Sequence, residues 1–256
     1  MNDNLIKNFR KKLKQKNQML IGGWIQICEP AIVEIMCSYK FDWITFDLEH
    51  GLFSTKNLSN LVRAAELSKK VKLARLPNHN KDFCSLVLDS GCDGVIIPNI
   101  KNEIELTKMR NLIYYPPIGK RGVGFSRENL FSKNFEKHAK KTKKPILISM
   151  IENKEGVKNL KKILKVKGLD GILIGPYDLS ASLNITGKFE NSLFKETINK
   201  IKKLSKEAGV PVGLHVLDNN FSSLKKLKQK GFNFFPYCTD AMLLNKAIKN
   251  SLNKNK

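Results

Sequence analysis

Eight short apolar segments recur along this chain of 256 residues, and helical patterns separate them. Each segment is almost continuously apolar, which is typical of strands that a parallel sheet buries on both faces. Eight strands alternating with helices in about 250 residues predict an α/β fold, a (β/α)8 TIM barrel. An open doubly wound sheet is the alternative, but GGWIQ after the first segment is not a phosphate-binding glycine loop. The predicted strands are 19–27, 41–48, 71–76, 93–100, 145–151, 170–176, 211–216 and 232–238.

Domain organisation follows from the even spacing of these segments, because no linker interrupts them. We expect one barrel domain over residues 1–256. The longest irregular stretch, 114–144, separates the fourth strand from the fifth. Loops of this length in a compact domain are usually functional or disordered, so we predict an ordered lid over the barrel mouth. A last helix, DAMLLNKAIKNSL, closes the chain.

Composition narrows the class of protein. The formal charge is +23, but the lysines alternate with Leu and Ile at helical spacing, which indicates solvated helix faces. Nucleic-acid binding is therefore the outside alternative. No apolar run approaches the roughly 18 residues of a membrane span, and the N-terminus lacks a secretory pattern. The chain has five cysteines, an odd number, and no pair has CxxC spacing. A disulfide framework is therefore not expected, which indicates a reducing cytoplasm.

Charged and polar residues end five of the eight predicted strands. In barrels of this kind such strand ends meet at one mouth, where active sites form. Two acids on neighbouring strands can hold a hard cation, an Arg can stabilise an oxyanion, and a His can move a proton. No predicted strand ends directly in Lys, which argues against a Schiff base. The residues are Asp47, Glu49, His50, Arg75, Glu152, Tyr177, Asp178 and His215.

Several motifs together resemble one family. WIQICEP, FDLEHG, LARLP, LDSGCDGVIIPNI, YPPIGKRGVG, MIENKEGVKNL and GPYDLSASLNITGKF occur in order over about residues 20–250. In this respect the chain resembles the HpcH/HpaI aldolases, class II pyruvate aldolases. The resemblance implies a TIM barrel of the phosphoenolpyruvate/pyruvate-domain type and a homo-hexamer that exchanges its last helix. It also implies a carbon–carbon lyase, which cleaves a 2-keto-4-hydroxy acid to pyruvate and an aldehyde with a divalent metal, Mg²⁺, Mn²⁺ or Co²⁺.

Carried over by motif, the resemblance also implies roles for single residues. His50 becomes the general base and Arg75 the oxyanion stabiliser. Asp89 raises the basicity of the histidine, across a subunit boundary. Glu152 and Asp178 become the metal ligands. The implied substrate contacts are Arg75, the backbone of Tyr177, Asp178 and position 150, where the family usually has Gln and this chain has Met150.

Some readings stay open on the sequence alone. Asp47 and Glu49 alternate along a strand, so one of them could support His50 and the other cap a helix; we favour Asp47 as the partner of His50. Without the family resemblance, Asp89 would be interpreted as a residue at the end of a helix. His215 either points into the mouth or has a structural role. A lyase acting on an acyl-CoA 3-hydroxy acid and a weakened pyruvate-binding relative, suggested by Met150, remain alternatives.

Overall fold

The structure, a computed structural model, describes residues 3–15, 18–51, 53, 57–133, 135, 144–217 and 220–253. Eight parallel strands form a closed barrel in the order of the chain, with β1 paired to both β2 and β8. This confirms the predicted (β/α)8 barrel. The strands are β1 (Leu20–Ile25), β2 (Trp43–Asp47), β3 (Val71–Arg75), β4 (Gly94–Ile97), β5 (Ile146–Ile151), β6 (Gly171–Ile174), β7 (Val212–Leu214) and β8 (Phe234–Pro236).

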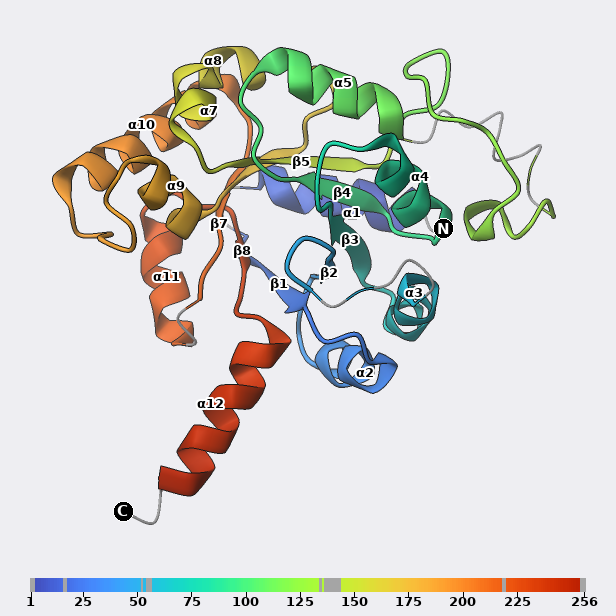
Figure 1. Cartoon of the computed structure of the whole chain (residues 1–256), viewed down its shortest axis with the longest axis horizontal. Coiled ribbons are helices and arrows are strands. Elements are labelled where there is room, and N and C mark those ends of the chain that lie inside the picture. The colour runs from blue at the N-terminus through green and yellow to red at the C-terminus, as the bar shows by residue number, and fades with distance from the viewer. Residues whose placement is uncertain are drawn as a thin grey trace.

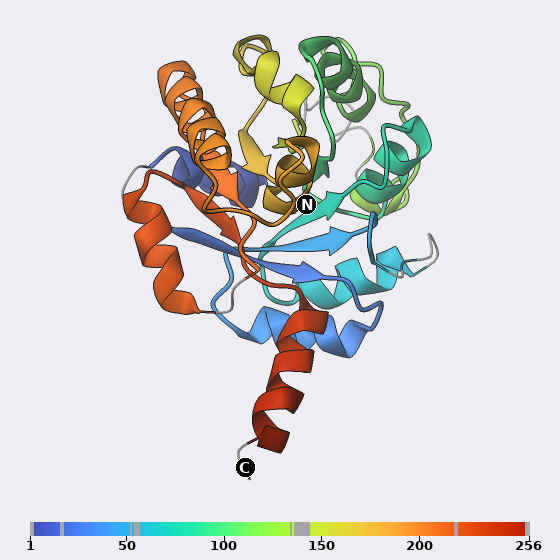
Figure 2. The same ribbon diagram turned by 60° about the vertical axis from the view of Figure 1, so that its left-hand side comes forward.

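Helices surround the barrel, and the last one projects away from it (Figures 1 and 2). The side-chain oxygen of an asparagine accepts a backbone N–H in the first turn of α4, α5, α7, α10 and α11, which satisfies a donor that the helix itself leaves unpaired. The helices are α1 (Asp3–Lys14), α2 (Pro30–Ser38), α3 (Leu58–Glu66), α4 (Lys81–Asp89), α5 (Glu103–Ile113), the short 3-10 helix η1 (Arg127–Asn129), α7 (Lys154–Lys158), α8 (Leu160–Ile163), α9 (Pro176–Ser182), α10 (Ser192–Ala208), α11 (Phe221–Gln229) and α12 (Asp240–Leu252).

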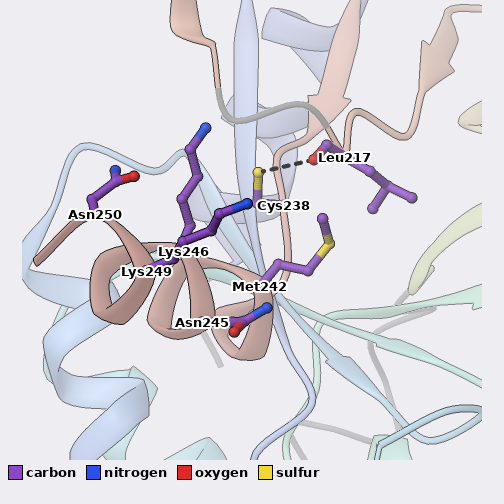
Figure 3. Close-up of a pocket in the computed structure, with 7 residues that line it drawn as sticks. All are labelled: Leu217, Cys238, Met242, Asn245, Lys246, Lys249 and Asn250. Carbon is purple, nitrogen blue, oxygen red and sulfur yellow. Dashed lines mark hydrogen bonds between the residues drawn. The ribbon is translucent and has the colours of Figure 1, made fainter. Parts of the chain in front are cut away.

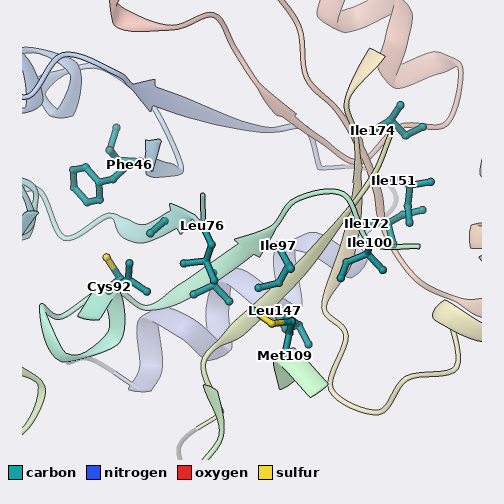
Figure 4. Close-up of a cluster of buried hydrophobic side chains, with 14 of the residues drawn as sticks. Phe46, Leu76, Cys92, Ile97, Ile100, Met109, Leu147, Ile151, Ile172 and Ile174 are labelled. Carbon is teal, nitrogen blue, oxygen red and sulfur yellow. The ribbon is translucent and has the colours of Figure 1, made fainter. Parts of the chain in front are cut away.

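The strand period of two divides the apolar residues into two layers. Alternate residues such as Phe46, Ile97 and Ile172 pack outward against the helices (Figure 4). The others fill the barrel, where Trp43 meets Phe234 at 6.0 Å between ring centroids. Helix α1 closes the amino-terminal end of the barrel with Ile6, Phe9 and Leu13. The interior is therefore a packed core, and only its carboxyl-terminal end is open to build a site.

The long loop after α5 does not lie where the sequence suggested. It connects a helix to the strand that follows it, so it belongs to the amino-terminal end of the barrel. Its contacts agree: the hydroxyl of Tyr114 donates to the carbonyl of Gly168, and Arg127 pairs with Glu66 at the end of α3. Figure 1 shows the described part of the loop on the side away from α9. The prediction of a lid over this chain's own mouth is wrong for residues 114–133, and 134 and 136–143 lie outside the described residues.

Helix α12 has few contacts with the rest of its own chain. Its side chains are exposed along most of its length, including the apolar Leu244, Ile248 and Leu252, which are 50 %, 51 % and 71 % exposed. Between α2 and α12 lies an apolar cavity of about 590 Å³. The predicted role of this helix in oligomer contacts stays a prediction. No helix in the described part of the chain is both long and apolar enough to cross a membrane.

Candidate active site

An ion pair organises the mouth of the barrel. Asp47 ends β2 and Arg75 ends β3, and the two residues are register partners. The guanidinium donates through Nε to Asp47 Oδ1 at 2.8 Å and through Nη2 to Oδ2 at 2.7 Å. Both residues are buried, and a bidentate contact of this kind fixes the plane of the guanidinium. Nη1 lies 2.8 Å from Glu49 Oε2, so Arg75 joins two carboxylates.

Asp47 accepts hydrogen bonds from other residues besides Arg75. Its carboxylate also accepts from Trp24 Nε1 at 3.0 Å and from Gln26 Nε2 at 2.9 Å. Burial by itself raises the pKa of Asp47. The hydrogen bonds and charge of Arg75, together with the hydrogen bonds from Gln26 and Trp24, outweigh burial and lower this pKa to about 2. Oδ1 accepts the backbone N–H groups of Glu49 and His50 at 3.2 and 3.3 Å. The described contact of Asp47 with His50 is therefore through the backbone, and it shapes the turn that carries the imidazole.

Glu152 is the least compensated acid of the mouth. It follows β5, is 6 % exposed, and accepts the backbone N–H of Asn99 at 2.6 Å. Asn99 has a φ of +49°, a left-handed conformation that asparagine tolerates better than most residues. Burial, followed by the charges of Asp178 and Glu49, raises the pKa of Glu152 to about 7. The Asn99 N–H and Arg75 only partly oppose this shift.

Asp178 completes an acidic centre. It lies in the first turn of α9, directly after β6, where it is exposed. Its charge raises the pKa of Glu49 as well as that of Glu152, although burial is the larger cause in both. One cation, Arg75, interacts with three carboxylates, Asp47, Glu49 and Glu152, while Asp178 adds a fourth negative charge beside Glu49 and Glu152. No group of three or more His, Cys, Asp or Glu side chains arranged as a metal cage occurs in the described ranges. A two-carboxylate site completed by water and substrate oxygens fits these residues.

The other predicted site residues lie at different depths of the same mouth. His50 is exposed in the turn after β2, where its ring is accessible to a substrate. Tyr177 begins α9, 49 % exposed, with its ring against Phe189 at 5.0 Å between centroids. Met150 lies deeper, 1 % exposed, in the apolar interior of the barrel.

Asp89 lies at the opposite end of the barrel. It is the last residue of α4, which runs back from the mouth toward the start of β4. Its carboxylate pairs with Arg121 Nη2 at 2.6 Å and is 46 % exposed. Asp89 and His50 of one chain are therefore separated by the length of the strands. Any action of Asp89 on the base requires a second copy of the chain.

This chain is similar to known aldolases over nearly its whole length. The sequence pattern of the HpcH/HpaI aldolase/citrate lyase family matches residues 20–247. The chain belongs to this family. A hydroxypyruvate/pyruvate aldolase of Roseobacter denitrificans is 30 % identical over 243 residues, 94 % of each chain. A 5-keto-4-deoxy-D-glucarate aldolase of Salmonella gallinarum is 30 % identical over 215 residues, 84 % of each.

Solved structures show the same fold. A HpcH/HpaI aldolase/citrate lyase family protein from Burkholderia cenocepacia superimposes with a TM-score of 0.90 at 21 % identity, covering 96 % of this chain and 98 % of its own. Family membership makes the protein a carbon–carbon lyase.

Sequence reasoning missed part of this candidate site. Trp24 was not named as a site residue, yet its indole N–H donates to Asp47 and its ring lies 5.1 Å from the Arg75 guanidinium carbon. Gln26 and Asn99 were not considered. The signal for Trp24 was present, since it lies on an inward-facing position of β1. Asn99 could not have been found, because its contribution is a backbone N–H.

A separate hollow of about 350 Å³ lies along one face of α12, and its lining residues include no carboxylate (Figure 3). Cys238 faces it, with Sγ 3.7 Å from the carbonyl oxygen of Leu217. Lys246 and Lys249 line its outer side, on α12. It lacks the acid and imidazole groups that the lyase chemistry needs, so the acidic mouth is the candidate active site.

Proposed function

We propose that the protein is a metal-dependent aldolase that cleaves a 2-keto-4-hydroxy acid to pyruvate and an aldehyde, or forms it in reverse. Two observations support this. The curated relatives at 30 % identity are aldolases, one of them named for pyruvate. Glu152 is a nearly buried carboxylate whose pKa burial and two neighbouring acids raise to about 7. The first observation carries the proposal, and the second indicates where a bound cation would be stabilised.

Glu152 and Asp178 are the residues that would hold the metal, Mg²⁺, Mn²⁺ or Co²⁺. A hard cation of this type often uses one or two carboxylates and leaves its other positions to water and substrate oxygens. When bound, it supplies Lewis-acid stabilisation of negative charge at the carboxylate and C2 oxygens of the keto acid.

The chain's own groups carry the proton and the charge. In cleavage, His50 takes the proton of the C4 hydroxyl as the C3–C4 bond breaks. The bonding electrons move to the C3–C2 unit as an enolate, and C4 leaves as the aldehyde. Arg75, fixed by Asp47, stabilises the negative charge on the C2 oxygen. The proton then returns to C3 and gives pyruvate.

A homo-oligomer, a hexamer by the family resemblance, belongs to the same proposal. Asp89 can reach a histidine only from another copy, and α12 exposes apolar side chains that a second copy would cover. The ion pair with Arg121 would orient the Asp89 carboxylate for that contact.

Pyruvate release from a set of 2-keto-4-hydroxy acids tests the proposal. We expect turnover with Mg²⁺, Mn²⁺ or Co²⁺, loss of turnover after exhaustive chelation, and recovery when metal is restored. Asp178→Asn should remove turnover, whereas Glu207→Gln, at an exposed position of α10, should not. Full turnover in the chelated protein would show that the metal-dependent assignment is wrong.

A further inference from the structure

His215 is a titratable group of the mouth to which the proposed reaction gives no role. It follows β7, and its ring packs against Trp24 at 4.6 Å between centroids, with an interplanar angle of 37°. Its backbone N–H donates to the carbonyl of Ile174 at 3.2 Å. The buried Nε2 atom has no hydrogen-bond partner among the described residues. A buried polar atom of this kind is costly unless a ligand or water satisfies it.

Strand register places His215 in the same layer as Glu152. Ile151 of β5 pairs with Ile174 of β6, and Ile174 pairs with Leu214 of β7. The residues that follow these three are Glu152, Gly175 and His215, so they lie in one row at the mouth. Ile151 and Ile174 pack outward against the helices. Because successive residues of a strand point to opposite faces, the residues that follow them point toward the barrel axis.

The middle member of this row has no side chain. A Cβ at Gly175 would lie 2.5 Å from Glu152 Oε2 and 3.3 Å from Met150 Cε. Glycine is therefore required where Glu152 and the methyl group of Met150 approach the β6 backbone. Because this row has no side chain between Glu152 and His215, it leaves a gap between these two above Gly175. Arg75 is also near, because it and His215 contact the same indole of Trp24.

The imidazole is neutral in this position. Burial is the main cause that lowers the pKa of His215 to about 3, and the positive charge of Arg75 adds to it, against Asp47. A neutral ring has one N–H and one lone pair, so Nε2 can donate to an oxygen of a bound anion without adding a charge.

We propose that His215 is a substrate-binding residue whose Nε2–H donates a hydrogen bond to an oxygen of the pyruvate half of the substrate, in the gap above Gly175. It thereby supplies from β7 the polar contact that Met150 cannot make from β5. This inference rests on the proposed function, because it takes the keto acid to bind beside Glu152. It also explains how a chain with Met at position 150 retains a polar pocket for a keto acid.

Oxalate binding in the presence of Mg²⁺ tests the contact without turnover, using calorimetry on the full chain. His215→Phe keeps an aromatic ring against Trp24 and removes the nitrogen. We expect it to bind oxalate about 10- to 100-fold more weakly, the loss typical of a hydrogen bond to a charged group. His215→Gln, which restores a donor, should recover part of the affinity. Thermal unfolding of His215→Phe should match wild type, which separates the contact from a folding defect.

A double variant tests the shared gap. Met150→Gln brings a donor into the same space from below, so it should restore oxalate binding in His215→Phe more than it improves wild type. Wild-type affinity in His215→Phe would overturn this inference and leave the proposed function standing. Equal effects of Met150→Gln in both backgrounds would also overturn it. Absence of any Mg²⁺-dependent oxalate binding in the wild-type protein would instead refute the proposed function, and this inference with it.

Discussion

Charged side chains are paired differently at the two ends of the barrel. Among the described residues of the amino-terminal end, charged side chains have close partners of opposite sign: the buried Lys72 Nζ lies 2.9 Å from Asp93, and the half-buried Arg10 Nε lies 2.7 Å from Asp170. At the carboxyl-terminal mouth, Arg75 serves two carboxylates by direct contact, and Glu152 has a backbone N–H as its described partner. At the amino-terminal end, which α1 closes, opposite charges are paired. The mouth, by contrast, has more negative than positive side chains.

This difference teaches which charges to assign to function. A matched buried pair contributes little net stability but is strongly destabilising when one partner is removed. An unmatched carboxylate costs stability in the free protein and gains from a bound cation. Removing a charge at the amino-terminal end should therefore lower stability and leave turnover unchanged. Removing a charge at the mouth should lower turnover and leave stability unchanged or higher.

The largest effect should come from the exposed base at the mouth. His50→Ala removes proton transfer, so the rate of pyruvate release should fall by about 10²–10⁴-fold. Its free energy of unfolding should hardly change, because the side chain is exposed. Steady-state kinetics and thermal unfolding of the same sample check both parts. Cleavage near the wild-type rate would place the base on another residue.

The next effect is one of stability at the closed end. Asp93→Asn leaves the 5 %-exposed Lys72 without its anion, and we expect a loss of about 3–5 kcal/mol in the free energy of unfolding. Turnover of the folded protein at low temperature should stay near wild type. Denaturant unfolding measures the loss. A drop in turnover without a drop in stability would contradict the division between the two ends.

The sequence predicted the barrel and most of the mouth for a simple physical reason. Apolar runs report strands buried on both faces, and a parallel barrel brings all their carboxyl ends together, so Asp47, Arg75 and Glu152 could be named in advance. The pairing of Asp47 with Arg75 could not, because it depends on register. The described residues 114–133 were predicted at the wrong end of the barrel because the length of the loop suggested function, while the order of helix and strand decides at which end of a barrel a loop lies.

Glu152→Gln should stabilise the metal-free protein by about 1–3 kcal/mol at pH 8. The folded-state pKa of Glu152, about 7, lies above the ordinary value of 4.5. Stability from this group is therefore fully present below about pH 4.5 and is lost as pH rises through 7. Thermal unfolding in chelator between pH 5 and 8 should show this loss in wild type and not in Glu152→Gln. Parallel pH profiles of the two proteins would mean that Glu152 is already compensated.

Mg²⁺ titration by calorimetry, with and without oxalate, tests the claim that the mouth is an unmatched site for a cation. Glu152 and Asp178 alone should bind Mg²⁺ modestly, and oxalate should tighten binding about 5- to 150-fold, with the same factor when the order of addition is reversed. Affinity should fall about tenfold for each pH unit below 7, as protons compete for Glu152. Glu152→Gln should abolish the metal signal. Binding of Mg²⁺ that Glu152→Gln leaves unchanged, or that oxalate does not tighten, would contradict the account.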